Sequence, residues 1–317
     1  MQKMQKLSNR PGYIFPMLVS LLLLLFCHAA LCATESMQAE QLPRRIVSLG
    51  PINTENVYLL EAGDRLVGTT TYCVRPEAAQ LTEKVGSVMQ VSVEKIIGLQ
   101  PDLVLATGLT RASQVDLLRK VGLKVVRFDQ PTSFGSSCEQ FEQLGRLLGL
   151  EEKALAISRD LQKEVRNMAE EIAARALPRQ KVIMQIGANP LYVSGSDSFT
   201  NDFIELLLAE NGIGDSPSGR IGYERVIAAN PDVILIGMMG SETGVAAEAQ
   251  KRLQQITVIK AVQNNRIHVV DPNLVCSPSP ATFVQALRVI APLIYPVLSE
   301  SRSEVLAKFG RQKGVFQ

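Results

Sequence analysis

Residues 92–105 read SVEKIIGLQPDLVL, and residues 222–235 read GYERVIAANPDVIL. The two stretches align without a gap, and most of the pairs that differ are conservative. The identical pairs are Glu94/Glu224, Ile97/Ile227, Pro101/Pro231, Asp102/Asp232 and Leu105/Leu235. Helix–turn–strand units can resemble one another by chance, but here the glutamate and the Pro-Asp pair match in register. A phrase that recurs once in each half of the chain predicts a structural unit that is used twice.

Elementary physical chemistry predicts the structure of this unit. Ser92 is a good helix cap, and Glu94 in the first turn suits the positive end of the helix dipole. Gln100 precedes a proline, which disfavours helical backbone and ends the helix. The continuous apolar run 103–106 is typical of a strand covered on both faces of a parallel sheet.

Strands and helices alternate on both sides of the repeated unit. In the first half we expect strands at 45–49, 66–70, 103–106 and 124–128, and helices at 55–62, 114–121 and 138–148. In the second half we expect strands at 181–186, 191–194 and 266–270, and helices at 203–210, 246–256 and from 281 onward. This alternation predicts two Rossmann-like α/β lobes with mostly parallel sheets.

Between the two halves lies one long helical stretch. From 151 to 177 apolar residues recur at helical spacing, without glycine or proline, which predicts one helix about 40 Å long. A helix of this length suits a rigid connection between lobes. The expected organisation is a signal peptide (1–33), a linker (34–43), an N-terminal lobe (44–150), the connecting helix (151–177) and a C-terminal lobe (178–317).

The first residues have the features of a secretion signal. Three basic residues precede the apolar run 14–27, and small residues follow near Ala33. The run is short for a membrane span, which needs about 20 residues. We therefore expect cleavage near Ala33 and a periplasmic protein. A retained anchor and a lipoprotein are the alternatives; bulky Phe26 and Leu31 before the two leader cysteines disfavour lipidation.

Charge and cysteine content limit the possible partners. The formal net charge of +2 includes three basic leader residues and no acidic one, so the remainder is close to −1. This gives no support for a nucleic-acid partner. Outside the leader the cysteines are Cys73, Cys138 and Cys276, an odd number that allows at most one internal disulfide. Cys73–Cys276 and Cys73–Cys138 are both open.

Longer motifs give a family resemblance. The motifs are IVSLGPINTE (46–55), VGTTTYCVRPEAA (67–79), QIGANPLYVSGSDS (185–198) and the two copies of the repeated phrase. Together they resemble the class III periplasmic solute-binding proteins, which serve ABC importers of cobalamin, haem and ferric siderophores. The stretch 189–195 is most similar to the cobalamin-binding members.

The resemblance implies a function and a binding site. It implies capture of a corrinoid or another metal chelate between the lobes, by a monomer that delivers it to a permease dimer in the cytoplasmic membrane. Haem or a ferric siderophore is the alternative ligand, and no cofactor or resident metal is expected. The implied ligand-binding residues are Pro51, Asn53, Tyr72, Cys73, Arg75, Met89, Asn189, Tyr192, Asp271 and Cys276.

Several of these assignments have a second interpretation. Tyr72 and Tyr192 would lie flat against a macrocycle or pack on their own lobes. Asp271 would accept hydrogen bonds from ligand amides or cap the turn at Pro272. Cobalamin-binding members often have tryptophan near Met89 and arginine at the position of Cys276. The chain has no tryptophan, so the ligand itself stays open.

The paired glutamates, Glu94 and Glu224, are predicted to have a role outside the binding site. The resemblance implies that one glutamate per lobe docks on the permease dimer. The alternative is that each only complements its helix dipole.

Two other functions are poorly supported by the sequence. An exported hydrolase would need an activated nucleophile, but Gly-x-Ser-x-Gly is absent and His268 is the only histidine after the leader. A site for bare zinc or manganese would need more histidine and carboxylate ligands than this. We therefore expect a binding protein, not an enzyme.

Overall fold

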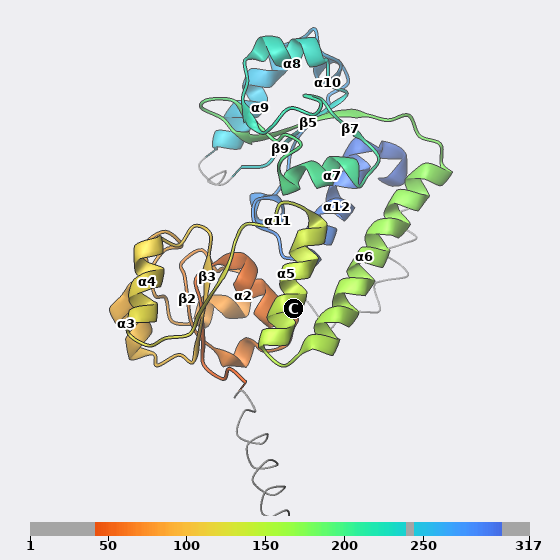
Figure 1. Cartoon of the computed structure of the whole chain (residues 1–317). Coiled ribbons are helices and arrows are strands. Elements are labelled where there is room, and N and C mark those ends of the chain that lie inside the picture. Colours follow the sequence, from red (N-terminus) through yellow and green to blue (C-terminus); the bar gives the residue numbers. More distant parts are fainter. Residues whose placement is uncertain (1–41, 239–243, 300–317) are drawn as a thin grey trace, which may run out of the picture. The chain divides into compact units, whose positions relative to one another are not determined.

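The computed structural model describes residues 42–238 and 244–299 (Figure 1). The predicted signal peptide, most of the linker and the C-terminal end lie outside these residues. None of the described helices is both long enough and apolar enough to cross a bilayer. The described residues from Pro43 to position 299 belong to one compact unit that contains two sheets.

The first sheet is entirely parallel. Its order is β2 (Leu66–Thr69), β1 (Ile46–Ser48), β3 (Leu103–Thr107) and β4 (Val125–Phe128). The helices that connect its strands are α2 (Pro51–Leu59), α3 (Val93–Gly98) and α4 (Ala112–Lys120), and α5 (Phe134–Leu147) follows β4. We call this part the N-terminal lobe.

The second sheet is mixed. Its order is β10 (Ile267–Val269), β9 (Val233–Ile236), β5 (Lys181–Gly187), β6 (Tyr192–Val193) and β8 (Gly219–Arg220), and β7 (Glu210–Asn211) also pairs with β5. Strand β6 runs antiparallel to both neighbours, while the other pairs are parallel. The helices are α7 (Asp202–Glu205), α8 (Tyr223–Ala229), α9 (Val245–Gln254), α10 (Lys260–Gln263), α11 (Pro272–Val275) and α12 (Pro280–Ile294). This part is the C-terminal lobe.

The two lobes are linked by α6 (Glu151–Ala174), which at 24 residues is about 36 Å long. It packs against α5 of the N-terminal lobe and α12 of the C-terminal lobe (Figure 1). Side chains also connect the lobes directly. Phe134 of α5 stacks on Phe283 of α12 with 5.0 Å between ring centroids, and its backbone N–H donates to the Asp202 carboxylate at 2.7 Å.

The repeated phrase forms the predicted unit in both lobes, as α3–β3 and as α8–β9. Ser92 caps α3, its Oγ accepting from the backbone N–H of Lys95. The residue before each proline turns into the left-handed region, with φ 48° at Gln100 and 44° at Asn230. This reversal ends the helix in both copies. The apolar runs of β3 and β9 are buried, as predicted for strands covered on both faces.

The two Pro-Asp aspartates perform the same structural task. Asp102 accepts backbone hydrogen bonds from Arg44 (2.8 Å) and Arg45 (3.1 Å), at the start of β1. Asp232 accepts one from Lys181 (2.8 Å), at the start of β5, and a second from the Lys260 ammonium (3.2 Å). Each aspartate thus fixes the first strand of its lobe beside the strand that it precedes.

Two predicted helices were wrong in extent. The helix expected over 55–62 is α2, which begins at Pro51 and ends at Leu59. We expected a helix over 203–210, but α7 ends at Glu205 and β7 begins at Glu210. Leu208 has φ 56°, which stops a helix, while Phe203, Leu207 and Ala209 are buried. The buried residues of this turn have the same apolar spacing as a longer helix, which explains the wrong prediction.

Candidate functional site

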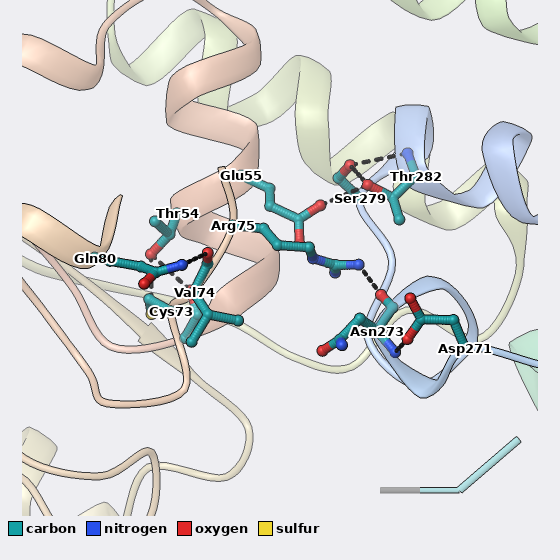
Figure 2. Close-up of polar contacts among 11 residues, drawn as sticks. Thr54, Glu55, Cys73, Val74, Arg75, Gln80, Asp271, Asn273, Ser279 and Thr282 are labelled. Carbon is teal, nitrogen blue, oxygen red and sulfur yellow. Dashed lines mark hydrogen bonds and ion pairs between the residues drawn. The ribbon is translucent and has the colours of Figure 1, made fainter. Parts of the chain in front are cut away.

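The loops at the carboxyl ends of the strands hold most of the predicted site residues. Open α/β sheets bind ligands at this edge. The segment after β2 contains Tyr72, Cys73 and Arg75, and the segment after β10 contains Asp271 and Cys276. The structure brings these two segments together across the lobes (Figure 2).

Arg75 makes the contact between the lobes. Its Nη1 donates to the backbone carbonyl of Asn273 in α11, and its Nη2 donates to Oε1 of Glu55 in α2. The second carboxylate oxygen of Glu55 accepts from the Thr282 hydroxyl at 2.7 Å, at the start of α12. Ser279 Oγ in turn donates to Thr282 Oγ1 at 3.1 Å. We call Glu55, Arg75, Asn273, Ser279 and Thr282 the inter-lobe cluster (Figure 2).

Glu55 is the buried charge of this cluster. Only 7% of its side chain is exposed, compared with 26% for Arg75. Burial raises the pKa of Glu55, and the charge of Arg75 together with the hydrogen bonds from Thr282 and Ser279 opposes that rise. Sequence reasoning missed this residue, since we assigned Glu55 only to the start of a helix. Two signals were available: Glu55 ends the motif 46–55, and it is the one charged residue of α2.

Asp271 performs the capping role that the sequence left open. Its Oδ1 accepts from the backbone N–H of Asn273 at 2.8 Å, at the beginning of α11. Cys276 is partly buried at the end of α11. The carboxylate of Asp271 thus fixes the turn that presents the Asn273 carbonyl to Arg75.

Cys73 lies beneath its loop, not on the loop surface. Its side chain is fully buried, with Sγ 3.1 Å from Thr54 Oγ1 and 3.2 Å from Thr70 Oγ1. The expected ligand contact therefore has no exposed surface in this conformation. Cys73, Cys138 and Cys276 are all in the thiol form, so neither of the disulfides that the sequence left open is formed.

The neighbours of Cys73 on the same loop point outward. Tyr72 is 54% exposed, and Val74 is also exposed. Met89, 59% exposed, lies on the turn 86–91, which is joined to this loop by a hydrogen bond from the Thr71 N–H to the Gly86 carbonyl. The two segments are therefore adjacent on the N-terminal lobe, and each carries exposed apolar side chains.

Pro51 and Asn53 lie at the start of α2, after β1. Pro51 is partly buried in the first turn of the helix. Asn53 is buried, and its Nδ2 donates to the Ala106 carbonyl at 3.2 Å, so this amide joins α2 to β3.

On the C-terminal lobe, Asn189 lies just after β5, and Tyr192 is the first residue of β6. Asn189 Oδ1 accepts from Arg252 Nη1 at 2.8 Å, and both residues line a hollow of about 170 Å³ with Tyr223 and Glu248. Tyr192 is exposed and pairs across the strands with Arg220. Ligand pockets commonly measure about 300–1,000 Å³, so this hollow suits a substituent better than a whole macrocycle.

No group of three or more metal-binding side chains occurs within 42–238 and 244–299. The histidine considered for catalysis, His268, lies on β10, where burial and the nearby charge of Arg266 lower its pKa. The chemistry assembled at the loops is that of binding: a buried ion pair, amides, carbonyl groups and exposed apolar side chains.

Comparison with known proteins defines the class. A family model described as "Periplasmic binding protein" matches residues 46–274, so the chain belongs to that family. An ABC transporter substrate-binding lipoprotein of Bacillus subtilis, YvrC, is 31% identical over 260 residues, covering 80% of this chain and 81% of the relative. The protein is accordingly an extracytoplasmic substrate-binding protein of an ABC importer, and its family consists of binding proteins, not enzymes.

Two further relatives differ in what they bind. A vitamin B12-binding protein of Salmonella typhi is 31% identical over 218 residues, covering 68% of this chain and 80% of the relative. The crystal structure of a periplasmic heme-binding protein from Pseudomonas aeruginosa matches with a TM-score of 0.72 and 25% identity, covering 80% of this chain and 94% of that one. The class III fold is therefore shared by relatives with different ligands.

Proposed function

We propose that the protein captures a corrinoid between its two lobes and delivers it to the permease of its importer. The vitamin B12-binding relative supports this ligand class. The alternative within the same function is haem or a ferric siderophore, and the heme-binding structure supports that alternative.

The observation that carries the proposal is the exposure of Tyr72, Val74 and Met89 on two adjacent loops. These side chains lie where open α/β sheets bind ligands, so a bound ligand can cover their apolar surface. Beside them, Arg75 and the Asn273 carbonyl supply polar groups that can fix the orientation of the ligand. A few polar groups among apolar side chains are typical of small-molecule sites.

Parallel titrations test the ligand. Cyanocobalamin, cobinamide, haemin and several ferric siderophores are added to the protein and followed by visible absorbance. We expect the tightest binding with a corrinoid, and Tyr72→Ala should weaken it roughly tenfold by removing apolar contact area. Leu117→Ala, which removes an exposed apolar side chain on α4, is the control and should bind as the wild type does. Binding of none of these chelates would reject the proposal.

We propose further that Glu94 and Glu224 dock on the two permease subunits. Both are exposed in the first turns of α3 and α8, and no bond of either occurs among the described residues. Ile97 and Ile227 follow at matching positions with 42% and 43% of their surfaces exposed. Each lobe thus offers the same carboxylate and the same apolar side chain, as suits a partner with two equivalent subunits.

The test is a charge reversal in both lobes. Glu94→Arg with Glu224→Arg should leave ligand affinity unchanged and abolish ligand-dependent stimulation of the importer ATPase in liposomes, because charge complementarity sets orientation and encounter rate. The control is Glu152→Arg with Glu170→Arg, two exposed glutamates on α6. Normal stimulation by the first double variant would leave only the helix-dipole role.

We also propose that residues 1–33 are removed on export, leaving a periplasmic protein. Intact-mass measurement of the exported protein should give an N-terminus near Thr34. A lipid on Cys27 or Cys32 would show instead that the protein is anchored, like the Bacillus relative, which is named a lipoprotein.

A further inference from the structure

The hydrogen bonds of the inter-lobe cluster all run toward Glu55. Ser279 donates to Thr282, Thr282 donates to one carboxylate oxygen, and Arg75 donates to the other (Figure 2). Both oxygens of Glu55 therefore act as acceptors. The Arg75 guanidinium has only donors and carries a full positive charge, so its contact with Oε1 favours the ionised form of Glu55.

Arg75 is consequently neutralised at its own site. Its Nη2 faces the Glu55 carboxylate, and its Nη1 is bonded to the uncharged Asn273 carbonyl. The pair carries no net charge. A carboxylate of a ligand that reached Arg75 would meet a guanidinium already paired, and it would lie close to a second carboxylate.

An uncharged amide group of a ligand can form hydrogen bonds at the same place. Its carbonyl oxygen can accept from Arg75 Nη1, and its N–H can donate to the Asn273 carbonyl or to Glu55. The cluster offers a donor and acceptors side by side, which matches an amide and not a free carboxylate.

We infer that Glu55 is a specificity-determining residue that selects chelates with amide groups on their rim over chelates with free carboxylates. The inference rests on the proposed binding of a chelate between the lobes. It assigns a function to a residue that was not among the predicted site residues, and the selectivity acts through the charge of Arg75.

A purely structural role of the cluster makes a different prediction. The same bonds hold α2 to α11 and α12, so any variant can loosen the lobes and weaken every ligand alike. The ratio of two affinities, measured on the same variant, is insensitive to such loosening. Haemin and haemin dimethyl ester form a suitable pair of probes, because they differ only in whether the two carboxylates are free.

The experiment measures both dissociation constants by absorbance for four proteins: wild type, Glu55→Gln, Arg75→Gln and the double variant. Glu55→Gln frees the charge of Arg75 and should shift the affinity ratio toward haemin about tenfold. Arg75→Gln should shift it toward the ester. The double variant, again neutral, should return to the wild-type ratio.

The outcomes separate the two proposals. Ratios that stay constant across the variants that fold, with binding retained, would overturn the inference about Glu55 and leave chelate capture intact. If Glu55→Gln does not fold, the shift of Arg75→Gln alone decides. Failure of wild-type protein to bind either probe or cyanocobalamin would overturn chelate capture and the inference with it.

Discussion

The two aspartates of the repeated phrase allow a prediction about the stability of the protein. The same substitution can be made in each lobe, so each lobe serves as the control for the other. Asp102→Ala removes the acceptor of the Arg44 and Arg45 backbone N–H groups, and Asp232→Ala removes that of Lys181 and the Lys260 ammonium. A hydrogen bond to a charged group contributes about 1.5–3 kcal/mol. Asp102 is exposed, so after its removal water can bind the backbone N–H groups and recover part of this stabilisation.

We therefore expect each substitution to lower the free energy of unfolding by about 1–2 kcal/mol. The surface ion pair of Asp232 with Lys260 adds at most about 1 kcal/mol to its effect. Because the two aspartates lie on different sheets, the double variant should show the sum of the single effects to within about 0.5 kcal/mol. Asp102→Asn keeps an acceptor oxygen and should cost less than Asp102→Ala.

Urea unfolding gives the magnitudes, and hydrogen exchange shows where protection is lost. Asp102→Ala should increase exchange at β1, and Asp232→Ala should increase it at β5. Asp116→Ala, an exposed aspartate on α4, serves as the control. If Asp102→Ala is no more destabilising than Asp116→Ala, or if exchange rises equally in both lobes, the strand-fixing role of the Pro-Asp pair is wrong.

Three further outcomes can be measured on the same protein. Phe283→Ala removes the middle ring of a three-ring stack and should cost about 3–5 kcal/mol in urea unfolding; an unchanged midpoint would contradict this. Iodoacetamide at about pH 8 should label Cys276 but not Cys138, whose pKa burial raises to about 11; peptide mass spectrometry decides. Because that pKa is raised on folding, the stability contributed by the Cys138 thiol is present below about pH 9 and lost as pH rises toward 11. Gly195→Ala should lower the melting temperature, because a Cβ there would overlap the backbone of Pro217. An unchanged melting temperature would show that the backbone of this loop can move aside without loss of stability.

Most of the fold was predictable because its signals are local. The buried runs of β3 and β9, the Ser92 cap and the helical spacing of α6 depend on neighbours in the sequence. The failure at 203–210 shows the limit. Burial at Leu207 and Ala209 comes from a turn packed on the core, and apolar spacing alone does not distinguish such a turn from a helix.

The candidate site was predictable only in part, because its contacts join distant segments. The resemblance indicated the loops that contain Arg75 and Asp271, which the structure brings near each other through Asn273. Glu55 was missed because its environment depends on Thr282, 227 positions away. Cys73 was expected to contact the ligand, but a loop sequence does not reveal which of its successive side chains turns inward, and Cys73 is buried.

The identical residues of the repeated phrase fall into two groups, which differ in the contacts that they make in the structure. Asp102 and Asp232 are bonded within their own lobes, so the fold itself is a sufficient reason for their matching positions. Glu94 and Glu224 have no such bonds among the described residues, and a helix dipole would accept a carboxylate at other positions of the first turn. Stability therefore explains the aspartates but not the register of the glutamates. Our proposal of a partner with two equivalent subunits accounts for both observations, because such a partner would meet the same carboxylate and the same exposed isoleucine on each lobe.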